Sequence, residues 1–375
     1  MHRWTVIAFI AVLACAGCGS HEDTSPRAST TDATPPAKPG EASSSTAAPA
    51  PETTPAPVAG AIPVTPDNFV RAESDTYMAG LAKEAGGLGK LFHHREPASI
   101  DNQTIVRLNR DTLYTAGLYD LDAGPVTVTL PDAGKRFQSL MFVNQDHYGW
   151  TEYGSGKHTV TRDKVGTRYV LVGIRTLVDP NDPKDVDEVH RLQDAIAVEQ
   201  KGGPGTLELP TWDAVSQGKV RDALKALGAT TPDFKGAFGL KDEVDPVRHL
   251  IGTAIGWGGN ADKDATYLNF TPQRNDGTTV YRLRVKDVPV DAFWSVSVYD
   301  AKGYYEKNPY NAYAVNSLTA KKEPDGSAVI QFGGCDDRIA NCIPVVPGWN
   351  YTVRLYRPQK AILDGTWKFP EAEPM

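Results

Sequence analysis

The sequence lacks the motifs that mark the common hydrolases and nucleotide-binding proteins. No serine stands in Gly-x-Ser-x-Gly, because Gly154-Ser155-Gly156 has other flanking residues, and this excludes the nucleophile elbow of α/β-hydrolases. No His-Glu-x-x-His motif occurs, and no Gly-x-Gly-x-x-Gly follows a predicted strand. Zinc proteases and dinucleotide-binding domains are therefore excluded as well, and we expect no cofactor.

Cysteine is scarce, with four residues in 375. Cys15 and Cys18 lie near the N-terminus, and Cys335 and Cys342 lie seven positions apart in one loop. Two cysteines without a nearby histidine cannot complete a zinc site, so we expect no metal. In an exported protein this pair is expected to form a disulfide, which stabilises the fold by about 2–3 kcal/mol.

Runs of lysine or arginine interleaved with aromatic residues are also missing, and the net charge is −7. A nucleic-acid-binding surface needs clustered positive charge to neutralise phosphates. Nucleic acid is therefore not an expected partner.

The N-terminal part predicts export and a lipid anchor. Met1-His2-Arg3 is basic, residues 4–14 are apolar, and Ala16-Gly17-Cys18 resembles the lipobox of bacterial lipoproteins, in which the cysteine is acylated. Residues 1–18 are therefore predicted to be a lipoprotein signal with Cys18 as the lipidated residue. The bulky Leu13 fits less well before Cys15, and an ordinary cleaved signal is the alternative. The expected location is the cell envelope, with the body anchored to the membrane and facing the periplasm or the exterior.

A tether is predicted to follow the signal over residues 19–63. It has no aromatic residue between Gly19 and Ala61, and nine of the 28 prolines lie between Pro26 and Pro63. Such a segment cannot bury enough apolar surface to offset its chain entropy. The folded body is expected to begin near Val64.

Short alternating strands dominate the body and predict a mainly β (α+β) fold with antiparallel sheets. Clear examples are residues 126–130, 136–144, 168–174, 279–285, 292–300, 327–332 and 350–356. Helices are expected over residues 69–81, 184–200, 212–227 and 245–255. We predict a β domain over residues 64–200, a helical connection over 201–256 and a second β domain over 257–375.

The stretch Asn109-Arg110-Asp111 is the main candidate for a binding site. Residues 104–108 alternate like a strand, so the three polar residues are expected to form a charged turn at its end, with Tyr114 close behind. A guanidinium fork beside a carboxylate and an amide suits a polar or anionic ligand. The alternative is a buried ion-pair network that fixes a corner of the fold.

Asp146-His147 is the main acid–base candidate. The histidine follows a predicted strand and could be oriented by Asp146 or by Asp111, so that it exchanges protons near neutral pH. A hydrogen-bonded structural histidine is the alternative.

Several motifs together resemble two bacterial families of unknown function. They are Asn109–Tyr114, Ser139–His147, Leu192–Ile196, Phe293–Asp300 and Gly348–Pro358. The chain is similar to DUF1254 over residues 69–200 and to DUF1214 over residues 257–358. The resemblance implies two β-sandwich-like or jelly-roll-like domains, a helical connection and a deep cleft. One departure is Asn341-Cys342-Ile343-Pro344, where many of the C-terminal family carry Asn-Trp-Leu-Pro.

Three hypotheses follow for function. The first is an envelope-anchored binding module whose pocket for a small molecule or glycan is formed by Asn109, Arg110, Asp111, Tyr114, Trp294 and Arg354. The second is a metal-free hydrolase or lyase in which His147 is the general acid or base, oriented by Asp111 or Asp146. In the third, these charges only stabilise the fold of a structural lipoprotein.

Overall fold

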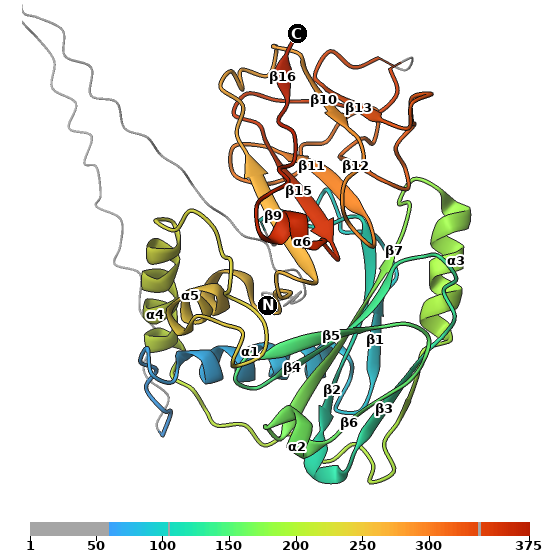
Figure 1. Cartoon of the computed structure of the whole chain (residues 1–375). Helices are drawn as coiled ribbons and strands as arrows, with labels where there is room; N and C mark the ends of the chain where they lie inside the picture. The colour runs from blue at the N-terminus through green and yellow to red at the C-terminus, as the bar shows by residue number, and fades with distance from the viewer. Residues whose placement is uncertain (1–59, 104–105, 337–338) are drawn as a thin grey trace, which may run out of the picture.

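A computed structural model describes residues 60–103, 106–336 and 339–375 (Figure 1). The predicted signal, Cys15, Cys18 and nearly all of the predicted tether lie outside the described residues. The body is mostly β, with antiparallel sheets in two sandwiches and helices beside them, which confirms the predicted fold class. No helix in the described ranges is long and apolar enough to cross a membrane.

The N-terminal sandwich pairs a five-stranded sheet with a three-stranded sheet. The five-stranded sheet has the order β1 (Leu91–His94), β2 (Thr112–Asp120), β7 (Tyr169–Leu177), β4 (Gln138–Asn144) and β5 (Gly149–Tyr153). The three-stranded sheet has the order β6 (Gly156–Val160), β3 (Val126–Leu130) and β8 (Ala197–Glu199). Leu140 and Phe142 of β4 pack against Val126 and Val128 of β3 between the sheets.

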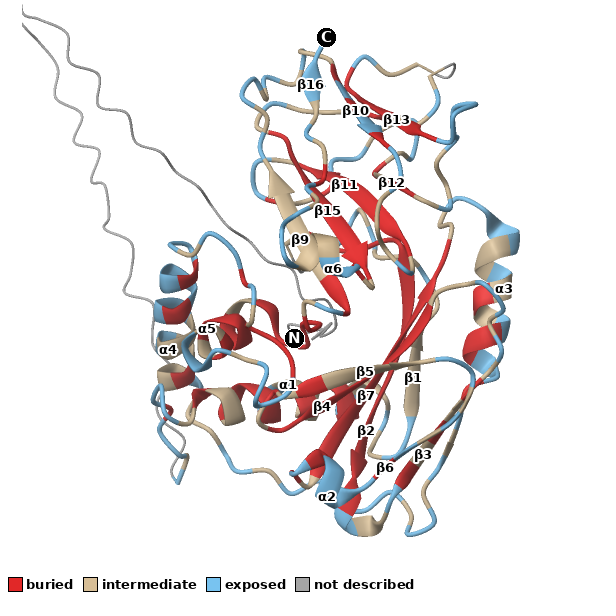
Figure 2. Ribbon diagram, in the orientation of Figure 1, coloured by how far each residue is buried: buried red, intermediate tan, exposed pale blue. Residues whose placement is uncertain are grey.

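Helices cover the other face of the five-stranded sheet. Met141 and Val143 alternate with the residues above and pack against Met78 and Leu81 of α1 (Phe69–Glu84). Because both faces are covered, β2, β4 and β7 are buried along their whole length (Figure 2). Two further helices, α4 (Ala214–Gly228) and α5 (Pro246–Gly256), pack beside α1 and join the two sandwiches.

The C-terminal sandwich contains two four-stranded sheets. One has the order β14 (Cys342–Ile343), β13 (Ala328–Phe332), β10 (Tyr281–Val285) and β16 (Glu373–Pro374). The other has the order β12 (Ala314–Asn316), β11 (Trp294–Tyr299), β15 (Asn350–Tyr356) and β9 (Ala265–Phe270). Their inner faces share one aromatic-rich core around Phe332, Trp349 and Tyr351.

The helix predicted over residues 184–200 is shorter than expected. The helix α3 (Pro183–Asp194) begins at Asp182, whose side chain accepts a hydrogen bond from the Lys184 backbone at 3.0 Å. It ends early because residues 197–199 pair with β3 as the edge strand β8. The short elements are the 3₁₀ helix η1 (Leu121–Ala123) and the helices α2 (Arg162–Val165) and α6 (Lys360–Leu363).

The prediction that Asn109-Arg110-Asp111 ends a strand was wrong. Residues 106–107 form a turn, and the three polar residues come directly before β2. Arg107 has a φ of 56° and its backbone N–H donates to the Gly303 carbonyl at 2.7 Å. The segment therefore docks on the C-terminal sandwich.

Candidate functional site

Residues 107–111, which we call the polar corner, come directly before β2 and lie at the interface between the two sandwiches. We call this interface the seam. The backbone carbonyl of Leu108 accepts hydrogen bonds from the hydroxyls of Tyr299 and Tyr305, both at 2.7 Å. Both tyrosines are buried, and they come from the C-terminal domain. A loop of one domain is thus held in the aromatic core of the other.

Arg354 of β15 belongs to this seam and is 1% exposed. Its guanidinium donates to Ser297 Oγ at 2.9 Å, to the Arg107 carbonyl at 2.9 Å and to Tyr299 Oη at 2.7 Å. Arg354 was predicted to line a ligand pocket. Its hydrogen-bond donors instead bind groups of the protein itself. It holds the seam together.

Asn109 and Tyr114 are also part of the packing. Asn109 Nδ2 lies 3.0 Å from Tyr114 Oη and 3.2 Å from Tyr356 Oη, and Asn109 Oδ1 accepts from the Asp111 backbone at 3.0 Å. Asn109 is 2% exposed. Trp294 lies in the core of the C-terminal sandwich, beside Phe369. Asn109, Tyr114 and Trp294 were predicted to contact a ligand, but none of them lines the cavity described next.

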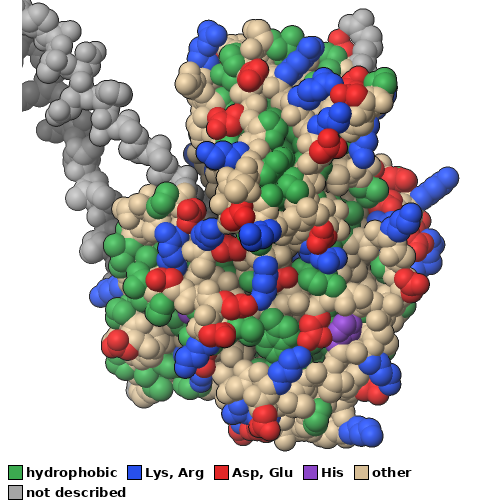
Figure 3. Space-filling view, in the orientation of Figure 1, with side chains coloured by type: hydrophobic (Ala, Val, Ile, Leu, Met, Phe, Trp, Pro, Cys, Tyr) green, Lys and Arg blue, Asp and Glu red, His purple; other side chains and the backbone are tan. Residues whose placement is uncertain are grey.

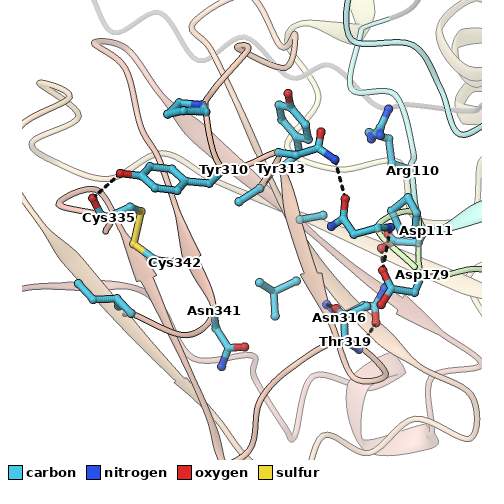
Figure 4. Close-up of a pocket in the computed structure, with 18 of the residues that line it drawn as sticks. Arg110, Asp111, Asp179, Tyr310, Tyr313, Asn316, Thr319, Cys335, Asn341 and Cys342 are labelled. Atoms are coloured by element: carbon cyan, nitrogen blue, oxygen red, sulfur yellow. Dashed lines mark hydrogen bonds between the residues drawn. A yellow bond between two sulfur atoms is a disulfide. The ribbon is translucent and has the colours of Figure 1, made fainter. Parts of the chain in front are cut away.

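Arg110 and Asp111 do reach a cavity, of about 560 Å³ (Figure 4). It opens between the corner before β2, the turn at residues 179–181 and two C-terminal segments, residues 309–319 and the disulfide loop. Polar side chains dominate its lining, including Asn181, Asn311, Asn316 and Asn341. The structure therefore brings together two of the six residues predicted to form a pocket.

Asp111 has an incomplete set of hydrogen bonds. Its side chain accepts from Asn316 Nδ2 at 3.0 Å through Oδ1, and the residue is 2% exposed. Oδ2 is buried and has no hydrogen-bond partner in the described part of the chain. A buried carboxylate oxygen without a hydrogen-bond donor lowers the stability of the fold by roughly 1–3 kcal/mol or more. We therefore expect a donor from a bound molecule to satisfy this oxygen.

Arg110 lies beside it and keeps unused donors. Its guanidinium donates to the Ala98 carbonyl and stacks 5.4 Å from the ring centre of Tyr313. No second hydrogen bond joins this guanidinium to the described residues. Burial lowers the pKa of Arg110, while the nearby Tyr305, Tyr313 and Asp111 act in the opposite direction. Arg110 nevertheless stays charged at physiological pH, because arginine titrates far above neutrality.

A disulfide between Cys335 and Cys342 closes the loop at one edge of the cavity, which confirms the predicted pairing. Tyr310 Oη donates to the Cys335 carbonyl at 3.1 Å and places its ring beside the opening (Figure 4). Tyr310 is 41% exposed. The cavity thus has an exposed aromatic ring at its edge and charged groups in its wall.

His147 lies away from this cavity, and the structure corrects its predicted surroundings. It is 3% exposed, with Nδ1 2.8 Å from Thr253 Oγ1 and Nε2 accepting from the Gly258 backbone at 2.7 Å. Burial, followed by the charge of His249, places the pKa of His147 well below its ordinary value. Both ring nitrogens bind groups of the α5 region and neither meets a carboxylate.

Asp146, the second proposed partner of His147, does not contact the imidazole. Its carboxylate forms an ion pair with Arg71 of α1, and both side chains are partly exposed. The proposed catalytic trio of His147, Asp111 and Asp146 is therefore not assembled, because Asp111 bonds to Asn316 at the seam.

Sequence reasoning missed the residues that the C-terminal domain contributes to the cavity. Tyr310, Tyr313 and Asn316 lie in the run Tyr310-Asn311-Ala312-Tyr313 and just beyond it. The tyrosine and asparagine content of this loop could have predicted a binding surface, because such side chains supply both stacking faces and hydrogen bonds.

Comparison with known families confirms the predicted pair. Residues 88–159 match DUF1254 and residues 265–360 match DUF1214, each described as a protein of unknown function. The two matches lie in the predicted order along the chain. Comparison with curated proteins gives no significant match.

Two solved structures are similar to this chain. The VPA0106 protein from Vibrio parahaemolyticus is 18% identical, with a TM-score of 0.62 over 82% of this chain and 97% of that chain. An uncharacterized protein from Burkholderia cenocepacia is 12% identical, with a TM-score of 0.45 over 82% of this chain and 86% of that chain. At 18% identity the first likeness shows a shared fold.

Proposed function

We propose that this protein is an exported, lipid-anchored envelope protein that binds a polyhydroxylated small molecule or glycan in the seam cavity. The observation that supports it is Asp111 Oδ2, a buried carboxylate oxygen without a donor in the wall of a 560 Å³ cavity. Cavities of about 300–1,000 Å³ are typical of small-molecule sites.

The chemistry of the wall favours hydroxyl groups. Asp111 needs a donor, and the Arg110 guanidinium beside it offers donors that need an acceptor. A hydroxyl both donates and accepts, so two neighbouring hydroxyls can satisfy both residues at once. The asparagine amides around them also offer both kinds of group, and Tyr310 offers an apolar face for C–H groups.

The anchor rests on the N-terminal sequence. A basic start, an apolar run and Ala16-Gly17-Cys18 support acylation of Cys18, with the tether holding the body away from the membrane. In cells fed labelled palmitate, the wild-type protein is expected to carry label and Cys18→Ser to lose it. Cys15→Ser is the matched control. Label that persists in Cys18→Ser would contradict this assignment.

Replacing Asp111 by asparagine tests the binding site. Wild-type protein is screened by thermal shift against monosaccharides, polyols and short oligosaccharides, and the affinity of each hit is measured by calorimetry. Asp111→Asn is expected to weaken binding by about 10-fold or more, because a hydrogen bond to a charged group contributes about 1.5–3 kcal/mol.

Asp75→Asn is the matched control for that experiment. Asp75 is 1% exposed and bonded to Gln145 and Trp212, so its replacement also changes a buried carboxylate but lies outside the cavity. Affinity that is equal in Asp111→Asn and wild type, or reduced equally by Asp75→Asn, would refute the proposed site. A panel without any hit would refute the ligand class.

A further inference from the structure

A second cavity of about 510 Å³ lies along the same seam. The N-terminal domain contributes residues 131–138 and 153–155, and the C-terminal domain contributes residues 291–293, 317–318 and Arg357. Neither the predicted site nor the proposed function uses this cavity.

Residues that are close in sequence line the two cavities. Leu177 lines the second cavity, and Asp179, two residues later, lines the first. On the other side of the seam, Asn316 and Thr319 line the first cavity while Ser317 and Leu318 line the second. Leu318 is 53% exposed, so the wall between the cavities reaches the surface.

We propose that the two cavities are neighbouring subsites of one cleft that holds a linear oligosaccharide. One sugar unit occupies the Arg110–Asp111 cavity and the following units pass over Leu318 into the second cavity. This inference rests on the proposed function and names the class of ligand. Each cavity alone has the size of a small-molecule site, and two adjacent ones fit a ligand of several units.

The lining of the second cavity suits sugar rings. Phe137 and Tyr153 are partly exposed and supply aromatic surface, while the buried Phe293 packs behind Phe137 with its ring centre 5.2 Å away. Charged groups of both signs surround them: Lys135, Arg136 and Arg357 are cations, and Asp132 and Asp291 are carboxylates. Aromatic faces with nearby donors and acceptors can bind the apolar and the hydroxyl-bearing sides of a sugar.

Arg357 is the residue best placed to contact the ligand there. Its guanidinium lies 4.7 Å from the ring centre of Tyr153 and 3.9 Å from Asp291, and no hydrogen bond joins it to the described residues. Its backbone has a φ of 52°, a conformation that costs a non-glycine residue about 1–3 kcal/mol. Arg136, by contrast, is bound to Asp185 and to the Leu177 carbonyl.

The positive φ of Arg357 allows its side chain to be removed without disturbing the backbone. Arg357→Gly removes the side chain at a position where glycine is unstrained, so the variant is expected to fold at least as well as wild type. Asp287→Gly is the matched control, because Asp287 has a φ of 49° and lines neither cavity.

The experiment measures, by calorimetry on the full-length protein, the affinity for series of one to six units of maltose-type, N-acetylglucosamine and galacturonate oligomers. In at least one series the affinity is expected to rise 10-fold or more between one unit and four. Arg357→Gly is expected to lose about 10-fold for the four-unit ligand and nothing for the one-unit ligand, and Asp287→Gly to change neither.

The outcomes separate the two proposals. Binding of single units with no gain on lengthening, or a gain that Arg357→Gly leaves intact, overturns the extended cleft and leaves the first subsite standing. Absence of binding in every series, by single units and by longer ones, overturns both.

Discussion

At the scale of single residues, Arg354 is a buried guanidinium whose hydrogen bonds include no carboxylate. Arg354 is 1% exposed, and its donors bind a serine, a tyrosine and main-chain carbonyls. Such a charge is tolerated only when its donors are satisfied. Arg354 therefore contributes to the stability of the seam.

Arg354→Met is expected to lower the free energy of unfolding by about 3 kcal/mol, because it leaves several buried acceptors without donors. Urea denaturation followed by fluorescence measures this change. Arg282→Met in β10 is the matched control, since Arg282 is exposed and is expected to change stability by less than about 0.5 kcal/mol. Equal losses in the two variants would show that Arg354 does not stabilise the seam.

The same residues show how far the sequence could predict the site. Arg110 and Asp111 were predicted from their chemistry, and both line the cavity. Asn109 and Arg354 have the same chemistry, yet their groups are bonded to protein. Which polar residue is satisfied internally depends on partners more than 200 positions away along the chain, and one sequence does not reveal them.

At the scale of secondary structure, strands with one solvent-facing side were easy to predict. The alternating burial of β3 and β10 follows directly from their sequences. Residues 106–108 were mispredicted because their backbone forms a turn that is hydrogen-bonded to the C-terminal domain, and residues 104 and 105 of the predicted strand lie outside the described residues. The end of α3 was missed because pairing of residues 197–199 with β3 outweighed their helical pattern.

His147, in the turn after β4, is hydrogen-bonded to Thr253 of α5 and to the Gly258 backbone just beyond it. Burial places the pKa of His147 well below its ordinary value, so just below pH 6.5 the imidazole of the folded protein stays neutral. The unfolded chain binds that proton below about pH 6.5, so the free energy of unfolding falls as the pH falls, by up to about 1.4 kcal/mol per pH unit.

In the His147→Asn variant, the free energy of unfolding is expected to fall less steeply as the pH drops below about 6.5. This expectation holds even if the variant is less stable than wild type at about pH 7.5. Asparagine tolerates the φ of 61° at this position, so the backbone is expected to stay in place. Urea denaturation at several pH values gives both slopes. Burial also lowers the pKa of His93 and His94, but both residues remain in the variant and cancel in the comparison. Identical slopes would contradict the lowered pKa of His147 in the folded protein.

At the scale of the whole molecule, the two sandwiches lie next to each other (Figure 1) and are joined by hydrogen bonds between side chains as well as by the chain itself. Asp111 bonds to Asn316, the Leu108 carbonyl to Tyr299, and Tyr153 Oη to Asp264 at 2.9 Å. Lys, Arg, Asp and Glu side chains are interspersed over the visible face (Figure 3). The seam therefore contains buried polar groups from both domains and also the walls of both cavities.

Because neither domain can satisfy these groups alone, the body is expected to unfold in one cooperative transition. Differential scanning calorimetry is expected to give one peak whose calorimetric and van't Hoff enthalpies agree. Arg354→Met, which weakens the seam, is expected to lower that single transition as a whole, or to split it with both parts below the wild-type Tm. Arg282→Met again serves as the control. Two separate transitions in the wild-type protein would contradict this coupling, because the seam would then contribute little to either domain and could not hold a preformed cavity between them.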